Sequence, residues 1–230
     1  TVEAIEMGSS VFLIDEDTSA TNFMIRDELM QRVVQRDVEP IIPFIDRVRE
    51  LYESYGISTI LVAGSCGSYF HKADTILQMN RYEPMEITAF AKKEAESFPM
   101  PTEQVLHSDK PDMKRIVKAD IAFQKDNRIK MKTMGKDGIS INKETVDLRY
   151  VEQLVDVEQL NALVCILKYM KLHVFEGKTT LQAGVEKLYQ QMEKKGFAAF
   201  CGNAVPGNMV LPRKQEIYAM LNRCRNLIKM

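Results

Sequence analysis

Two adjacent carboxylates close the first apolar run of the chain. Residues 11–14, Val-Phe-Leu-Ile, lead directly into Asp15 and Glu16. Four consecutive apolar residues are typical of a central parallel strand that is covered on both faces, and open α/β sheets bind ligands at the carboxyl ends of such strands. Two ionised carboxylates at that position repel each other, and a divalent cation relieves the repulsion. A Mg²⁺ ion held by one carboxylate and by phosphate oxygens would leave the second carboxylate to orient or deprotonate a water.

A plainer interpretation of the same residues is an acidic turn that caps the next helix. Aspartate is a preferred helix N-cap, and any buried strand must end in something polar. The pair alone does not decide between the two interpretations, but the flanking residues favour the catalytic one. Under that interpretation, Asp15 and Glu16 form a Walker B motif, the side of a phosphate-hydrolysing site that handles the metal and the water.

The sequence around the pair carries a more specific pattern. The stretches VFLIDEDTSATNFMIRD, from residue 11, and EPIIPFIDRVRELYESYGISTILVAGSCGSYFHKADTILQM, from residue 39, resemble the predicted ATPases of the ABC class. These proteins are related to the ATPase subunits of transporters but lack a transport domain. A weaker resemblance continues through KETVDLRYVEQLVDVEQLNAL and PRKQEIYAMLNRCRNL, so it covers nearly the whole chain.

The resemblance implies roles for individual residues. Asp15 matches the Walker B aspartate that is associated with Mg²⁺, and Glu16 matches the catalytic glutamate that polarises the attacking water. The resemblance also implies ATP and Mg as cofactors and a homodimer as the working assembly. The loop that crosses the dimer interface in this class, the D-loop, matches Ser19, Ala20, Thr21 and Asn22. Asn22 stands where transporters usually have an aspartate, so this loop would lack the usual charge.

A second strand is predicted at residues 59–64, TILVAG, because β-branched residues favour strands and the run ends at glycine. Transporter ATPases place a switch histidine just after this strand, whereas this chain has Gly64 and Ser65. A serine can hydrogen-bond a phosphate or a water but cannot supply an imidazolium, so we expect slow hydrolysis. We interpret His71, further on, as a surface histidine rather than as a displaced switch residue.

Two motifs of a complete site do not occur in the 230 residues. The phosphate-binding pattern Gly-x-x-x-x-Gly-Lys-Ser/Thr is absent, since the tail Gly177-Lys178-Thr179 has Leu172 where the first glycine should be. The ABC signature is also absent, and residues 1–8 resemble the last turns of the signature helix with Gly8 as its C-cap. We therefore expect a carboxyl-terminal part of a longer ATPase that works with the amino-terminal part of the same protein and is inactive alone.

Composition sets broad limits. An apolar content of 45% supports a genuine core, and a formal net charge of −1 gives no overall argument for nucleic acid. Four cysteines without CxxC spacing indicate neither a zinc site nor a disulfide framework, and a reducing cytoplasm is the expected location. No apolar stretch is long enough to cross a bilayer, so no membrane partner is expected.

Periodicity predicts the order of elements. Helices are expected at residues 22–34, 43–55 and 86–97, and strands at 59–64 and 75–79, which together suggest half of a RecA-like α/β sheet. Beyond a linker at 98–127, a hairpin is expected from 128–133 and 138–141, followed by helices at 151–170, 180–194 and 214–228. The predicted plan is an ATPase core at 1–97 and a small, mostly helical α+β domain at 128–230.

One charge asymmetry stands out. Residues 110–143 contain ten Lys or Arg against four Asp. A solvated face is one interpretation, because alternating lysines often protect a sheet edge. A nucleic-acid-binding module whose ATP site gates a clamp is the alternative, with backbone contacts from Lys114, Arg115, Lys118, Arg128, Lys130 and Lys132. A third hypothesis treats these residues as a scaffold that only mediates dimer contacts.

Overall fold

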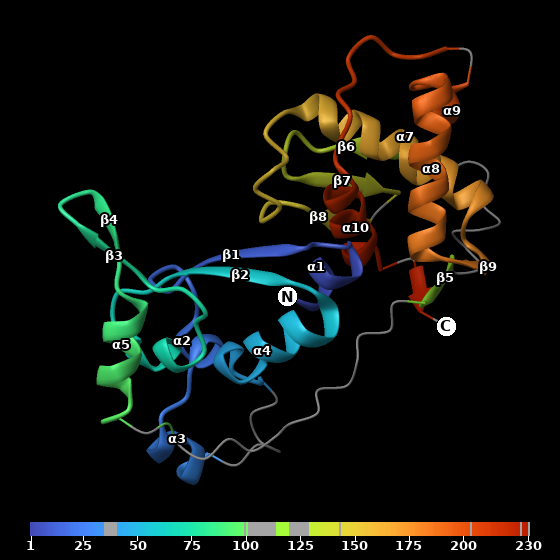
Figure 1. Ribbon diagram of the computed structural model, residues 1–230. Coiled ribbons are helices and arrows are strands. Elements are labelled where there is room, and N and C mark those ends of the chain that lie inside the picture. The colour runs from blue at the N-terminus through green and yellow to red at the C-terminus, as the bar shows by residue number, and fades with distance from the viewer. Residues whose placement is uncertain are drawn as a thin grey trace. The chain divides into compact units, whose positions relative to one another are not determined.

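The computed structural model describes residues 1–34, 41–98, 100, 114–119, 129–142, 144–202, 204–225 and 227–229. The chain forms two compact units, one of Ser9–Lys110 and one of Thr1–Gly8 together with Pro111–Met230 (Figure 1). The first eight residues therefore group with the carboxyl-terminal part of the chain, which differs from the predicted core at 1–97.

The unit of residues 9–110 is built on two parallel strands. Strand β1 (Val11–Asp15) pairs with β2 (Ser58–Val62), in a register that places Asp15 opposite Val62. Helix α4 (Phe44–Tyr55) precedes β2, and Gly56 ends the helix in the left-handed conformation that suits glycine (φ 66°). The helix predicted at 43–55 and the strand predicted at 59–64 are thus confirmed in type, with small shifts of their ends.

The two faces of this small sheet are unequally covered. Helix α4 contacts β2, and Figure 1 shows α4 and α2 (Thr21–Met24) on one side of the strands. On the other face, apolar side chains stay open to solvent, with Leu13 77% and Ile60 61% exposed. The expectation that β1 is covered on both faces is therefore not met by the described residues, because their helices lie against one face only.

The helix predicted at 22–34 is broken in the structure. Helix α2 ends at Met24, and Ile25 is extended (φ −154°, ψ 153°). A new helix, α3 (Glu28–Val33), then begins behind Asp27, whose side chain accepts a hydrogen bond from the Met30 N–H at 2.7 Å. Apolar spacing suggested one continuous helix, but the N-cap at Asp27 starts a second one.

A strand is present near the predicted position 75–79, but it does not join the parallel sheet, so its predicted place in a RecA-like sheet is wrong. Strand β3 (Leu77–Asn80) pairs instead with β4 (Glu83–Glu86) in an antiparallel hairpin. The two-residue turn is formed by Arg81 (φ 49°) and Tyr82 (φ 71°), the backbone conformation that lets neighbouring segments pair locally. Figure 1 shows this hairpin projecting beside helix α5 (Thr88–Ala95), which itself contacts the 3₁₀ helix η1 (Gly67–His71).

The carboxyl-terminal unit contains a three-stranded antiparallel meander. Strands β6 (Met131–Thr133) and β7 (Gly138–Ile141) form the predicted hairpin, with Gly135 at positive φ in its turn. Strand β8 (Glu144–Asp147), which was not predicted, adds to β7. Helix α7 (Val157–His173) packs on this sheet.

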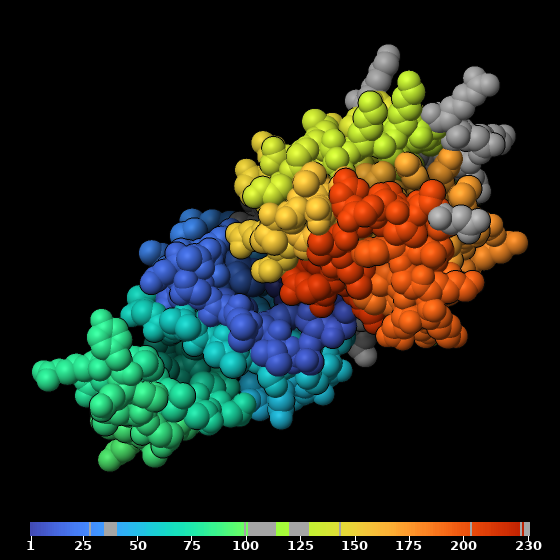
Figure 2. Space-filling view, turned by 90° about the horizontal axis from the view of Figure 1, so that it is seen from above, coloured from blue at the N-terminus to red at the C-terminus, as the bar shows by residue number. Residues whose placement is uncertain are grey.

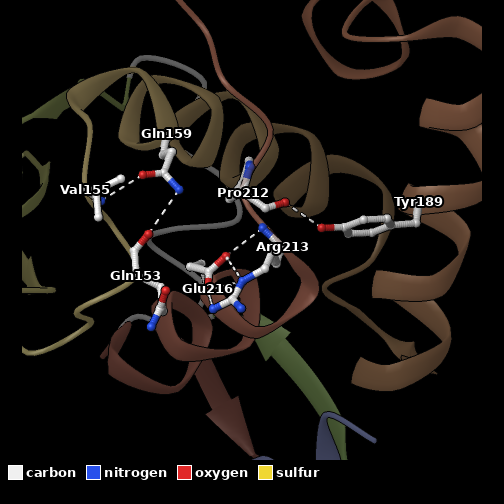
Figure 3. A network of polar contacts seen from close by, with 7 residues as sticks. All are labelled: Gln153, Val155, Gln159, Tyr189, Pro212, Arg213 and Glu216. Atoms are coloured by element: carbon white, nitrogen blue, oxygen red, sulfur yellow. Dashed lines mark hydrogen bonds and ion pairs between the residues drawn. The ribbon is translucent and has the colours of Figure 1, made fainter. Parts of the chain in front are cut away.

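Helix α7 begins later than the predicted residue 151 because its cap fixes the start. The Asp156 carboxylate accepts a hydrogen bond from the Glu158 N–H at 2.9 Å. The Gln159 side chain reaches back to the Val155 N–H at 2.8 Å and to the Gln153 carbonyl at 3.1 Å (Figure 3). Side chains of this kind satisfy amide groups that the first helical turn leaves unpaired.

A second antiparallel sheet joins segments that are distant in sequence. Its strand order is β10-β5-β9, from β10 (Leu227–Lys229), β5 (Ile116–Ala119) and β9 (Glu176–Thr180). Strand β5 falls inside the predicted linker at 98–127, most of which lies outside the described residues. Strand β10 occupies the end of the predicted helix 214–228, which stops at Arg223 as α10 (Lys214–Arg223).

The core of this unit lies between the two sheets and the helices. It includes Leu160, Leu163, Phe175, Leu188 and Ile217, which are fully buried. Helix α8 (Leu181–Lys195), the short helix α9 (Ala198–Cys201) and α10 gather with the yellow-green meander in one closely packed body in Figure 2. The connection into α10 is tied to α8 by the Tyr189 hydroxyl, which donates to the Pro212 carbonyl at 2.5 Å (Figure 3).

We expect Gly138→Ala to destabilise this unit by about 2–3 kcal/mol. A Cβ at position 138 would lie 2.3 Å from the Val146 carbonyl oxygen, so β7 and β8 would have to separate. Gly207→Ala is the control, because a Cβ there meets no described atom within 4 Å. Urea unfolding of both variants measures the difference, and equal midpoints would contradict the close strand pairing.

Candidate functional site

The register of β1 and β2 places Asp15 and Glu16 beside the loop that follows β2. Asp15 pairs with Val62 at the ends of the two strands, and the Glu16 N–H continues the ladder by donating to the Val62 carbonyl at 3.0 Å. Because the strands are parallel, both run out at the same edge of the sheet. The side chain of Glu16 therefore meets residues 64–66.

The Glu16 carboxylate accepts four hydrogen bonds from this loop. Its Oε2 atom accepts from the backbone N–H groups of Gly64 at 2.9 Å, Ser65 at 3.0 Å and Cys66 at 3.2 Å. Its Oε1 atom accepts from the Ser65 hydroxyl at 2.6 Å. Successive backbone N–H groups that converge in this way form an anion-binding concavity, and here the bound anion is the protein's own glutamate.

These contacts set the charge of Glu16. The hydrogen bond from the Ser65 hydroxyl, followed by the backbone N–H groups, lowers the pKa of Glu16 to about 2. Hydrogen bonds that favour the ionised form have this effect on any carboxyl group. In this arrangement Glu16 is a strong hydrogen-bond acceptor and a weak proton acceptor, so it is better suited to orienting a water than to deprotonating one.

Asp15 is fixed by the turn that follows it. Its Oδ2 atom accepts a hydrogen bond from the Thr18 hydroxyl at 3.0 Å, and its backbone carbonyl accepts from the Ser19 hydroxyl at 2.7 Å. Within the described residues, no three His, Cys, Asp or Glu side chains come together to hold a metal ion. A single carboxylate suits Mg²⁺, which usually takes one or two protein carboxylates and completes its shell with water and phosphate oxygens.

The residues predicted for the D-loop lie directly beyond this turn. Ser19 is half-buried and holds the Asp15 carbonyl, whereas the next three residues are exposed. Ala20 is the N-cap of α2, and the helix opens with Thr21 and Asn22. Their exposure leaves them accessible beside the acid pair, and their contact with a second subunit stays a prediction.

Sequence reasoning assigned Gly64 and Ser65 to a switch region but missed their contact with Glu16. It also missed Cys66, whose N–H completes the set of donors, and Thr18, which holds Asp15. The only signal for the loop was the run of three small residues after a strand. Burial raises the pKa of the Cys66 thiol, so Cys66 contributes its backbone rather than a thiolate.

His71 and the Gly-Lys-Thr tail, which could be mistaken for parts of the site, have other places in the structure. His71 is exposed, and its Nε2 atom pairs with the Phe98 carbonyl at 2.9 Å. The Gly-Lys-Thr tail at 177–179 lies in strand β9, and the Thr180 hydroxyl accepts from the Ala183 N–H at 3.2 Å as the cap of α8. Thr180 therefore caps the following helix, and the tail belongs to a strand and a helix start.

The basic residues proposed for nucleic acid divide into two groups. The guanidinium of Arg115 is engaged by other side chains of the same unit. Its Nε donates to Glu6 at 2.5 Å, and its Nη2 donates to both Glu6 and Asn222. Lys118 is half-buried in β5, and Arg128 lies outside the described residues. The exposed members of the set are Lys114, Lys130 and Lys132.

Removing the Ser65 hydroxyl should raise the pKa of Glu16 toward its usual value. The lowered pKa means that the contacts stabilise the fold above about pH 4.5, and that this stabilisation is lost as pH falls toward 2. In Ser65→Ala we expect the pKa of Glu16, measured by carboxyl ¹³C NMR, to rise. Ser58→Ala, at the exposed start of β2, is the control and should leave the titration unchanged. An unshifted Glu16 in Ser65→Ala would contradict the geometry described here.

Two family models match parts of this chain. A family model of the ABC_ATPase P-loop domain matches residues 1–115, and a model of the MRB1590 C-terminal domain matches residues 130–229. No curated protein matches the chain. Among the described residues, no helix is both long and apolar enough to span a membrane. The P-loop family uses nucleotide and Mg²⁺ in general, and by the match over residues 1–115 this chain belongs to the ABC-class P-loop ATPases.

Proposed function

We propose that this chain supplies the residues that handle metal and water in an Mg²⁺-dependent ATP-hydrolysing site. The main support for the proposal is the set of four hydrogen bonds that residues 64–66 donate to the Glu16 carboxylate. Glu16 lies next to Asp15, at the end of the same strand. A capping turn, the plainer interpretation of the pair, does not account for four donors from the neighbouring strand's loop. The family match supports the same assignment.

Asp15 would hold the metal in this proposal. Thr18 occupies its Oδ2 atom and fixes the carboxylate's orientation, while Oδ1 has no hydrogen-bond partner among the described residues. Bound Mg²⁺ would neutralise phosphate charge and polarise the bond that is to be broken. The adjoining Glu16 would keep its own charge, because its pKa lies far below neutral pH.

Glu16 would position the attacking water. A carboxylate that is held by the loop after β2 can accept a hydrogen bond from a water and aim its lone pair at the phosphate. The low pKa of Glu16 makes proton abstraction inefficient in this conformation, and Ser65 cannot supply the positive charge of a histidine. Both features support slow turnover.

The remaining parts of the site come from elsewhere in this proposal. The 230 residues contain no phosphate-binding loop pattern, so we assign that element and the signature to another part of the same protein. We further propose a homodimer in which the exposed residues 20–22 approach the partner's nucleotide. The 230-residue chain alone should then bind ATP weakly and should not hydrolyse it.

A nucleic-acid contact remains a second candidate, as a module whose ATP site gates a clamp. The observation that favours it is the exposure of Lys130 and Lys132 on and beside β6. Arg115 is not available for such a surface, because Glu6 and Asn222 engage its guanidinium. Binding of this kind would weaken steeply with salt concentration.

The test of the main proposal is Asp15→Asn, in a protein that joins these residues to a phosphate loop. We expect ATP hydrolysis to fall by about 100-fold and the Mg²⁺ concentration for half-maximal rate to rise, because the only proposed protein ligand loses its charge. Asp17→Asn, the exposed neighbouring acid, is the matched control. An unchanged Mg²⁺ requirement in Asp15→Asn would remove Asp15 from the metal site.

A further inference from the structure

The exposed residues 20–22 lie between two hydrogen bonds that fix both ends of their segment. On the amino-terminal side, the Ser19 hydroxyl donates to the Asp15 carbonyl at 2.7 Å. On the carboxyl-terminal side, the Tyr69 hydroxyl donates to the Met24 carbonyl at 2.7 Å. This second bond joins residues that are 45 positions apart in sequence, and both of them are buried.

Tyr69 lies directly beyond the loop that holds the Glu16 carboxylate. Cys66, whose backbone N–H is one of the donors to Glu16, is also the N-cap of the 3₁₀ helix η1. Because a 3₁₀ helix has about three residues per turn, Tyr69 lies one turn beyond Cys66. Helix η1 packs against α5, so the loop and Tyr69 are parts of one supported segment.

The hydroxyl of Tyr69 acts as a donor to a carbonyl that needs one. Met24 is the last residue of α2, and the last carbonyls of a helix have no partner within it. Met24 is only 1% exposed and Tyr69 only 6%, so water does not replace the bond easily. Burial raises the pKa of Tyr69 far above its usual value, so the hydroxyl stays protonated. Its removal would leave a buried acceptor without this donor, which costs free energy.

Helix α2 is short enough to move as one piece. It has four residues, and the Ala20 carbonyl accepts from the N–H groups of both Phe23 and Met24 at 3.0 Å. The Phe23 ring lies 5.6 Å from the Phe44 ring, which holds the same turn on α4. A displacement of Met24 is therefore passed to the exposed start of α2.

We propose that Tyr69 is a positioning residue that couples the exposed residues 20–22 to the loop that orients Glu16. When a second copy of the chain contacts residues 20–22, α2 shifts, and the bond between Tyr69 and Met24 passes the shift to residues 64–66. Such coupling needs a physical connection between the two places, and α2, Tyr69 and the loop supply it. The inference rests on the proposed function, because it assigns a control to the same site.

The first test measures the coupling without ATP, by amide hydrogen exchange of the 230-residue chain followed by NMR. Glu16→Gln disturbs the loop, so we expect the Met24 and Ile25 N–H groups, which donate within α2, to exchange faster. The increase should be at least about fivefold, the lower end of couplings between sites. In Tyr69→Phe, exchange should already be fast, and adding Glu16→Gln should change it by less than about twofold, because coupled changes are not additive.

Tyr55→Phe is the matched control. The Tyr55 hydroxyl is buried at the end of α4 in the same unit and has no hydrogen-bond partner among the described residues. This variant should keep the full response to Glu16→Gln. The inference is overturned if Glu16→Gln leaves the Met24 and Ile25 amides unchanged in the otherwise unaltered chain, a result that needs no Tyr69 variant. A response of the same size in Tyr69→Phe would also overturn it.

The second test uses a protein that joins these residues to a phosphate loop. Tyr69→Phe should lower kcat by roughly tenfold, because a misplaced catalytic group loses rate even when it is present. The KM for ATP should stay within about twofold, since Tyr69 has no proposed contact with nucleotide. If Glu16→Gln loses hydrolysis while Tyr69→Phe keeps its full kcat, the inference is overturned and the proposed function stands.

Discussion

In a protein that joins these residues to a phosphate loop, Glu16→Gln should reduce the rate of ATP hydrolysis by about 100-fold or more. Removal of a positioned base or water-orienting group costs roughly that much. The ATP affinity should stay within a few fold of the unaltered protein. The substitution preserves volume but changes the hydrogen bonding. Glu16 accepts from three backbone N–H groups and one hydroxyl, and the NH₂ group of glutamine cannot accept from any of them. The steady-state rate and calorimetric ATP affinity are the measurements.

Asp17→Asn is the matched control for this experiment. Asp17 is the next carboxylate along the chain and is exposed, and it receives none of the four hydrogen bonds that hold Glu16. We expect its rate to stay within about threefold of the unaltered protein, since surface substitutions away from such contacts have small effects. Equal losses in both variants would mean that the local negative charge matters, rather than the position of Glu16.

Arg115→Met should destabilise the carboxyl-terminal unit by about 3 kcal/mol, the usual size of the effect when one member of a buried ion pair is removed. The side chains of Arg115 and Glu6 are only 12% and 9% exposed and are joined at 2.5 Å. Without Arg115, the Glu6 carboxylate would be left desolvated and without its partner. Urea unfolding followed by circular dichroism measures the loss, and Lys132→Met, at an exposed position on β6, is the control.

A double variant separates the pair from its surroundings. Glu6→Gln together with Arg115→Met removes both charges, so we expect it to lose less stability than the two single variants combined. Additive losses would indicate that each side chain acts through other contacts, such as the bond of Arg115 to Asn222. An Arg115→Met protein as stable as the unaltered one would show that the ion pair does not hold α1 (Val2–Glu6) in place.

Local patterns in the sequence were sufficient for the elements beside the site. The apolar run 11–14 predicts β1, the spacing of Phe44, Ile45 and Leu51 predicts α4, and all of these elements are present. Helix ends depend on particular capping residues. The helical spacing of apolar residues therefore did not predict the break between α2 and α3 or the late start of α7. Asp27 and Asp156 carry that information, because their side chains bind the first free amides of each helix.

Long-range pairing could not be predicted in the same way. Strands β5, β9 and β10 are three to five residues long and come from distant parts of the chain, so none carries a pattern of its own. The same limit applies to Arg115, which a count of local charges assigns to a basic surface. Its partner Glu6 is 109 residues away in sequence and only the fold brings them together.

The sequence indicated only part of the candidate site. Residue type and position proposed Asp15 and Glu16, because two carboxylates directly follow the apolar run 11–14. The contact of Glu16 with Ser65 depends on the register between β1 and β2, which one sequence does not specify. The structure therefore adds a lowered pKa and a defined orientation to a residue that the sequence had only named.

The nucleotide that the Glu16→Gln protein retains reports whether Glu16 directs the water that attacks ATP. The variant, in a protein that includes the phosphate loop, would be incubated with ATP and Mg²⁺, separated from free nucleotide, denatured and analysed by chromatography. We expect the bound nucleotide to be intact ATP, whereas the unaltered protein should retain mainly ADP. Bound ADP in the variant at the same level as in the unaltered protein would show that Glu16 does not direct the hydrolytic water.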